Sequence, residues 1–493
     1  MQKKQTILVV ASLLLVVLSV TLAYFTAQII GKGKDVSVSS ADLKIIFTDS
    51  DGAISGSNIE PGWSDTKTFT VENNSKSEYK YNIVIKDLLN TFVTNGYLQY
   101  KITSTNGGYN MTEFKDVPKS SVATDTILAY SVVIPNGVTQ SYTIEFKYVN
   151  DESVDQSDDM GKKLSGKLFI TEGTEDPNKT LYNQLLADKS TKLTRTDFST
   201  VLTTNNTKTL YTGVEDSKTV YYFAGNATDN WVKFGKNASN QDLYWRIIRT
   251  NSDGSVRLLY HGTSTTTTDA YIGTSAFNSS FDNIAYVSYM YGNLGSVANA
   301  RENTTNSTIK TIIDNWYKDN LNTNYGKYLS TTAVYCNDRS TSDNTNFGAY
   351  TRLGTNKTPS YDCTATEDKF TVDNSTGNGK LTYPIALMTA DEVSFAGGLW
   401  ITNAPTWYYY NSANGSSTGS TWWWLLSPNN WSGGSADVFS VLGSSIPGRL
   451  NVSNVGSAYG VRPVISLKSC IKYSTGNGSA SDPYTIKETA SGC

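Results

Sequence analysis

This sequence has few histidines and cysteines, and its net charge is close to zero. It contains one histidine, His261, and four cysteines among 493 residues. A single histidine excludes histidine-rich metal sites and most histidine-based catalysis. No two cysteines have the Cys-x-x-Cys spacing of a structural zinc site. We therefore expect no metal site and no cofactor.

The charges of the chain nearly cancel. It has 41 Lys and Arg residues against 44 Asp and Glu residues. Such a chain has no basic field that would attract phosphate groups. We therefore expect no nucleic-acid partner.

The abundant residues are aromatic, or small and polar. There are 32 Tyr and 10 Trp, and Asn, Ser, Thr and Gly are frequent in the rest of the chain. Aromatic side chains give a binding surface contact area, and small polar side chains give adaptable hydrogen bonds. This composition is typical of an extracellular β-rich binding protein. It also fits a β-protein whose Tyr, Thr and Trp only build strands.

The four cysteines form an even set, which predicts disulfides in an exported chain. The simplest arrangement pairs neighbours, Cys336 with Cys363 and Cys470 with Cys493. The sequence alone leaves this connectivity open.

Residues 1–30 predict export. Residues 1–5 are basic, and residues 6–25 are almost wholly apolar, about the length that crosses a bilayer. This segment is either a signal peptide that is cleaved or an N-terminal membrane anchor. Both alternatives place the rest of the chain outside the cytoplasm, either secreted or anchored at the cell surface.

Residues 31–173 consist of short segments in which apolar and polar residues alternate, such as 81–85 and 141–146. Turn sequences rich in Gly, Pro and Asn separate these segments. The spacing predicts an all-β sandwich. Residues 174–180 are polar and include Pro177, so we expect them to form a linker.

Three short motifs in this half resemble the TasA/camelysin-type family of surface and fibre proteins. They are residues 23–26 (AYFT), 60–64 (EPGWS) and 69–73 (FTVEN). The resemblance implies a jelly-roll-like exported domain that can self-assemble into fibres. The alternative is a monomeric sandwich that serves only as a spacer.

Residues 181–493 predict a second, α+β domain. Strand-like segments at 244–249 and 256–260 flank a turn with Asp253-Gly254, which predicts a hairpin. An amphipathic helix and a short capped helix follow along the chain. The apolar face of the amphipathic helix is predicted to consist of Ile309, Ile312, Ile313 and Trp316, and its N-cap is Ser307 or Thr308. The short helix has a predicted capping box formed by Thr389 and Glu392.

The most informative stretch is residues 422–468. It opens with three consecutive Trp, continues through Ser427-Pro428 and polar loops rich in Gly, and ends in Gly-Val-Arg-Pro at 460–463. This pattern resembles C-type-lectin-like domains of the formylglycine-generating-enzyme-like fold, including the variable proteins of diversity-generating retroelements. The resemblance implies a small twisted sheet whose long loops present a binding surface. Pro463 predicts either an edge strand or the start of a strand.

The predicted ligand-binding residues lie between 427 and 460 and combine amide, aromatic, carboxylate and guanidinium groups. They are Asn429, Asn430, Trp431, Asp437, Phe439, Ser444, Arg449, Asn451, Asn454 and Tyr459.

Catalysis is not predicted. The formylglycine-generating enzyme uses cysteines in its active site, and residues 422–468 contain none. Asp391, Glu392 and Asp437 could meet as acid–base groups, but the first two fit the opening turn of a helix better. No carboxylate–amide motif of a calcium-dependent lectin is found.

The sequence thus predicts an exported bacterial cell-surface protein that binds an extracellular protein or glycan, as an adhesin or receptor-type binder. The alternatives are a structural fibre or matrix protein, and an extracellular enzyme.

Overall fold

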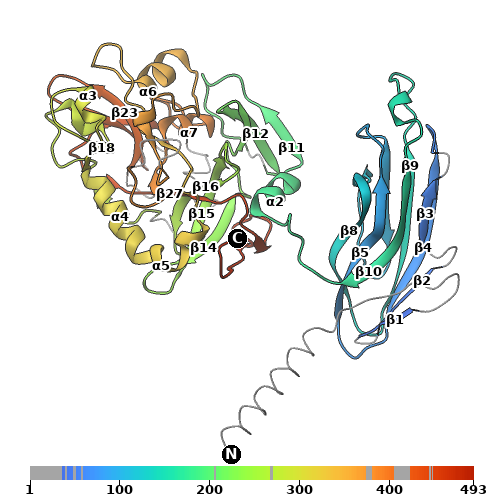
Figure 1. Ribbon diagram of the computed structural model, residues 1–493. Helices are drawn as coiled ribbons and strands as arrows, with labels where there is room; N and C mark the ends of the chain where they lie inside the picture. Colours follow the sequence, from blue (N-terminus) through green and yellow to red (C-terminus); the bar gives the residue numbers. More distant parts are fainter. Residues whose placement is uncertain are drawn as a thin grey trace, which may run out of the picture. The chain divides into compact units, whose positions relative to one another are not determined.

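The computed structural model describes residues 36–38, 41–47, 52–56, 59–204, 207–266, 270–373, 380–404, 422–443, 446 and 448–493 (Figure 1). The apolar run at 6–25, the motif at 23–26 and Ser444 lie outside the described residues. Within the described part of the chain, no helix is both long enough and apolar enough to cross a membrane. The chain divides between Pro177 and Asn178 into two compact units, and this point falls inside the segment 174–180.

The first unit consists of two antiparallel sheets that share one core (Figure 1). The larger sheet has the order β1 (Val36–Val38), β2 (Ala41–Phe47), β4 (Ser64–Asn73), β9 (Thr139–Tyr148), β6 (Leu98–Ser104) and β7 (Lys115–Asp116). The smaller sheet has the order β3 (Ala53–Gly56), β10 (Leu164–Glu172), β5 (Tyr79–Asn90) and β8 (Ser120–Ile134).

Alternation along the strands explains why these sheets pack face to face. Every second residue of β9 is buried, from Gln140 to Tyr148, as expected for a strand with one covered face. The Tyr81 hydroxyl on β5 joins the two sheets: it donates to Gln140 Oε1 at 2.6 Å and lies 2.6 Å from the Tyr142 hydroxyl. The sandwich predicted for this half is therefore present in the described residues.

The second unit is built on a larger mixed sheet. Its main path is β11 (Thr191–Thr194), β12 (Thr209–Glu215), β13 (Lys218–Tyr222), β15 (Asp242–Thr250), β14 (Trp231–Lys236), β29 (Tyr484–Ile486) and β28 (Tyr473–Thr475). A branch continues from β15 through β16 (Val256–Gly262) and β27 (Pro463–Leu467) to β22 (Ile385–Leu387). The β15–β16 hairpin confirms the predicted one, with Gly254 at a positive φ of 79° in its turn.

A five-stranded sheet carries most of the stretch 422–468. Its order is β17 (Thr274–Ser275), β26 (Tyr459–Gly460), β23 (Trp423–Trp431), β24 (Ala436–Val441) and β25 (Leu450–Asn454). Trp423 and Trp424 are both fully buried although they point to opposite faces, so both faces of β23 are covered at this point. Pro463 begins β27, which pairs with β16 on one side and β22 on the other, so the proline marks a strand start and not an edge.

The helices of this unit are mostly short. They are α2 (Leu181–Asp188), α3 (Val297–Ala300), α4 (Thr308–Asn320), α5 (Asn322–Tyr325), α6 (Gly348–Tyr350) and α7 (Ala390–Phe395). The predicted capping box of α7 is confirmed, and Ser307 is the N-cap of α4.

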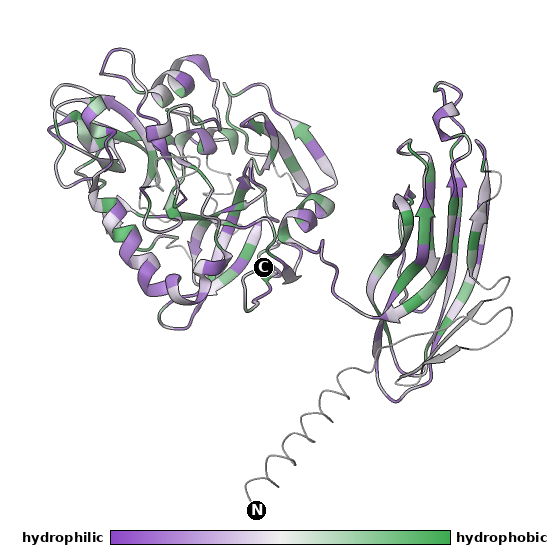
Figure 2. Cartoon of the chain, viewed as in Figure 1, coloured by the Kyte–Doolittle hydropathy of each residue, from purple (hydrophilic) through white to green (hydrophobic). Residues whose placement is uncertain are grey.

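One part of the α4 prediction is wrong. Ile312 is 40% exposed, whereas Lys310 and Asp314 are buried as an ion pair. The buried stripe is centred on Ile309, Ile313 and Tyr317, which follow one another every four residues, and Ile312 lies outside it. Hydrophobic and hydrophilic residues alternate along this helix in Figure 2.

Two disulfides join the cysteines in the neighbour pairing, Cys336–Cys363 and Cys470–Cys493. The first links β20 (Tyr335–Cys336) to a loop, and the second ties the last residue to the segment after β27. Two disulfides and a β-rich, two-unit architecture are typical of secreted or extracellular proteins.

Candidate functional site

Most of the predicted binding residues lie on strands of the five-stranded sheet and not on loops. Asn429, Asn430 and Trp431 end β23, Asp437 and Phe439 belong to β24, Asn451 and Asn454 to β25, and Tyr459 to β26, while Arg449 immediately precedes β25. The polar residues that predicted loops are therefore mostly parts of strands.

Two of these residues are buried, so their assignment to a binding surface is wrong. Asn429 is 1% exposed because a register shift between Pro428 and Asn430 turns it inward, where its carbonyl accepts the Phe347 amide at 3.0 Å. Phe439 is 0% exposed and packs edge-on against Trp400, with ring centroids 5.2 Å apart. Both side chains support the sheet from within.

Tyr459 and Arg449 are only partly accessible. The Tyr459 ring lies 5.1 Å from that of Trp422 and 4.9 Å from that of Trp424, as expected for a packing aromatic. The Nε atom of Arg449 is buried and has no hydrogen-bond partner in the described residues.

Asn430, Asp437 and Asn454 are brought together by the sheet. Asn430 is directly opposite Asp437, and Asp437 is directly opposite Asn454. Directly paired residues of adjacent antiparallel strands project to the same face, with strands about 4.8 Å apart. All three side chains are partly exposed. We call these three residues the polar row.

Hydrogen bonds fix the geometry of the polar row. The Ser435 hydroxyl donates to Asp437 Oδ1 at 3.0 Å, and Asn454 Nδ2 donates to the Ser435 hydroxyl at 2.7 Å. Burial raises the pKa of Asp437, and the Ser435 hydrogen bond opposes that rise. The carboxylate accepts hydrogen bonds, and the amide groups beside it can also donate them, which suits hydroxyl or amide groups of a ligand.

The remaining residues do not join the polar row. Trp431 pairs with Ala436, and Asn451 pairs with Ser440, so both project to the opposite face of the sheet. The ten predicted residues are therefore split between two faces, and only three of them form a compact polar group.

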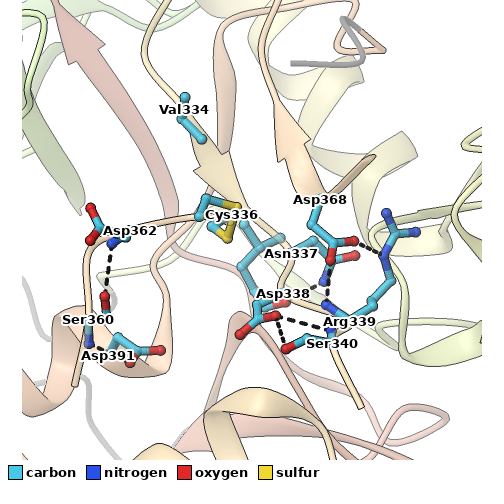
Figure 3. Close-up of a disulfide and its surroundings, with 12 residues drawn as sticks. Val334, Cys336, Asn337, Asp338, Arg339, Ser340, Ser360, Asp362, Asp368 and Asp391 are labelled. Atoms are coloured by element: carbon cyan, nitrogen blue, oxygen red, sulfur yellow. Dashed lines mark hydrogen bonds and ion pairs between the residues drawn. A yellow bond between two sulfur atoms is a disulfide. The ribbon is translucent and has the colours of Figure 1, made fainter. Parts of the chain in front are cut away.

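A second polar cluster was not predicted as a unit. It lines a small pocket between β15, β16 and α7. The pocket lies beside the Cys336–Cys363 disulfide, whose surroundings are shown in Figure 3. Glu392 Oε1 accepts from Arg249 Nε at 2.9 Å and from Arg257 Nη1 at 2.7 Å, and Arg249 Nη2 also contacts Glu215 Oε1 at 2.7 Å.

Arg352 completes this cluster. It makes a two-pronged contact with Asp391, at 3.0 and 2.9 Å, and a further contact with Asp338 at 2.6 Å. The Ser360 amide donates to the same Asp391 carboxylate at 3.0 Å (Figure 3). Asp391 and Glu392 are thus engaged by different arginines.

The charges in the pocket stabilise one another. Burial alone would raise the pKa of Glu392, but Arg257 and Arg249 outweigh it and the pKa is lowered. The pKa of Asp338 is lowered because Arg352 outweighs burial in the same way. Both carboxyl groups are therefore held ionised, which suits ion pairing and not proton donation near neutral pH. Asp437 does not line this pocket.

The described residues contain no group of three or more His, Cys, Asp or Glu side chains that could hold a metal ion.

No protein-family model matches the chain, and no curated protein matches it. Among solved structures, the chain is similar to "Crystal structure of a ruminal GH26 endo-beta-1,4-mannanase", with 14% identity over 31% of this chain and 28% of that chain. The TM-score is 0.15, which is too low to indicate a shared fold, so this similarity assigns neither architecture nor activity.

Proposed function

We propose that this chain is an exported bacterial cell-surface protein whose second unit binds an extracellular protein or glycan. The observation that carries this proposal is the polar row of Asn430, Asp437 and Asn454, which is partly exposed and held by hydrogen bonds on a rigid sheet. Fixed polar groups above a packed core lose little conformational entropy when a ligand binds. The lectin-like resemblance of residues 422–468 is consistent with this role.

The proposal includes the arrangement along the chain. Residues 6–25 would export the protein, either as a signal peptide or as a membrane anchor. The first unit would act as a spacer, and the second unit as an adhesin or receptor-type binder. We propose no catalytic activity, because the buried carboxylates around the disulfide are bound to arginines.

Binding of the purified protein to arrays of glycans and of extracellular proteins tests this proposal. For each array member that is bound, the Asn454→Ala variant should bind about tenfold more weakly, since one lost ligand hydrogen bond costs about 1.4 kcal/mol. Asn451→Ala is the matched control, because Asn451 lies on the same strand but on the opposite face. Equal losses in both variants would count against the polar row.

A second candidate function, self-assembly through the first unit, has its own supporting observation. The strand β8 lies at the edge of its sheet, contains 15 residues without proline, and carries Val122 at 67% exposure. Exposed edge strands of this kind can pair with a strand of another copy. Filaments seen by electron microscopy that persist after deletion of residues 181–493, and disappear in Val122→Lys, would favour this function.

A further inference from the structure

A cavity of about 430 Å³ lies in the second unit, on residues separate from the polar row. Four segments that are distant in sequence line it: the end of α2 with Asp188 and Lys189, residues 207–208, residues 228–229, and residues 477–479. This volume is within the range of small-molecule binding sites.

The charges that line the cavity are balanced by internal contacts. Lys189 Nζ is buried and lies 2.8 Å from Asp229 Oδ2, which also accepts the Lys208 amide at 2.8 Å. Asp188 accepts from Gln184 Nε2 at 2.6 Å and from the Tyr484 hydroxyl at 2.7 Å. The two lysines and two aspartates leave the cavity without net charge, so neither an anion nor a cation is favoured as the ligand.

Lys208 gives this wall of the cavity an accessible donor, whereas Asp229 is 6% exposed and its Oδ1 atom is buried. Lys208 has a positive φ of 58°, a strained conformation for lysine that places its exposed side chain at the cavity.

The other lining groups are hydroxyls and an amide. Thr228 Oγ1 lies 3.1 Å from Thr207 Oγ1, and Asn477 uses its Oδ1 to accept the Ser479 amide at 2.9 Å. The lining therefore offers both donors and acceptors. A hydroxyl group can donate and accept at the same time, so neighbouring hydroxyls of one ligand match this lining.

We propose that the cavity binds a neutral, hydroxyl-rich ligand of the size of one sugar residue. Lys208, Thr228 and Asn477 donate to its oxygens, and Asp188 accepts from its hydroxyls. The ligand is either a free monosaccharide or the terminal residue of a glycan chain. This site is independent of the polar row, so either proposal can fail alone.

Calorimetric titration of the full-length protein tests this site. The probes are glucose, galactose, mannose and N-acetylglucosamine, each also as the terminal residue of an oligosaccharide. We expect at least one probe to bind, with an affinity about tenfold lower in Thr228→Val and in Asn477→Ala, as expected for one lost hydrogen bond. Thr219→Val, on the exposed face of β13, is the matched control and should bind like the parent protein.

The outcomes separate the possibilities. Binding of free sugars and oligosaccharides alike indicates a monosaccharide site, and binding of oligosaccharides alone indicates a glycan-end site. No binding of any probe, or binding that Thr228→Val and Asn477→Ala leave unchanged, overturns the proposal. Loss of binding in Asn454→Ala, with Thr228→Val unaffected, would place sugar recognition in the polar row instead.

Discussion

Replacing Glu392 by Gln tests whether the arginine cluster around the first disulfide is structural. Glu392 is 1% exposed and is the carboxylate that both Arg249 and Arg257 contact. The Gln side chain has the same size and can still complete the capping box of α7, so the substitution removes mainly the charge. Arg249 would keep Glu215, whereas Arg257 would lose the carboxylate that it contacts.

The expected cost follows from the burial of these groups. Removing one partner of a buried ion pair typically costs about 3–5 kcal/mol, because a desolvated charge remains. We expect Glu392→Gln to cost an amount near the lower end of this range, because Glu215 still compensates the charge of Arg249. Glu488 is exposed, and Glu488→Gln should change the free energy of unfolding by less than about 0.5 kcal/mol.

Urea unfolding followed by tryptophan fluorescence measures this effect. Nine of the ten tryptophans follow residue 178, so the signal reports mainly on the second unit. Glu392→Gln should lower the midpoint without changing the slope of the transition. A variant within about 1 kcal/mol of the parent would refute the structural role of the cluster.

Three further predictions concern pH, packing and the disulfides. The pKa values of Glu392 and Asp338 are lowered in the folded protein, so these two carboxylates stabilise the fold fully above pH about 4.5. This stabilisation is lost as the pH falls through their pKa values in the folded protein. Urea unfolding measured at a series of pH values should show the loss, and the loss should be smaller in Glu392→Gln. Phe439→Ala should destabilise the second unit by about 3–5 kcal/mol in the same urea assay, because the ring is fully buried against Trp400, and a loss below about 1 kcal/mol would contradict its burial. Reduction of both disulfides should lower the calorimetric melting temperature, since each closes a loop worth roughly 3 kcal/mol, and an unchanged melting temperature would argue against the bonds.

Local patterns in the sequence predicted local structure correctly. The hairpin around Asp253-Gly254 depends on a turn that favours positive φ, and the α7 capping box depends on Thr389 and Glu392, three residues apart. Each of these features is determined by neighbours in the chain.

The arginine cluster could not be predicted from local patterns. Arg249 and Glu392 are separated by 143 residues, and only the pairing of β15 and the position of α7 bring them together. A signal was nevertheless present: Arg246, Arg249 and Arg257 stand within otherwise apolar strands, where an arginine needs a buried partner.

The site on the five-stranded sheet was predicted in composition but not in geometry. Asn429 is buried because a register irregularity follows Pro428, and one extra residue reverses which side chains face outward. Asp437 and Asn451 lie on opposite faces because side chains alternate along each strand. Register is a property of paired strands, and a single strand sequence does not specify it.

Hydrogen exchange measured with a bound array member tests the central proposal most directly. Residues 432–435 form the turn that carries Ser435 next to the polar row, and Ser432, Gly433 and Gly434 are exposed in the unbound protein. The proposal predicts that ligand binding slows amide exchange in this turn and leaves the exposed turn at Asp216 and Ser217 unchanged. Slowed exchange that is confined to other parts of the chain would contradict it.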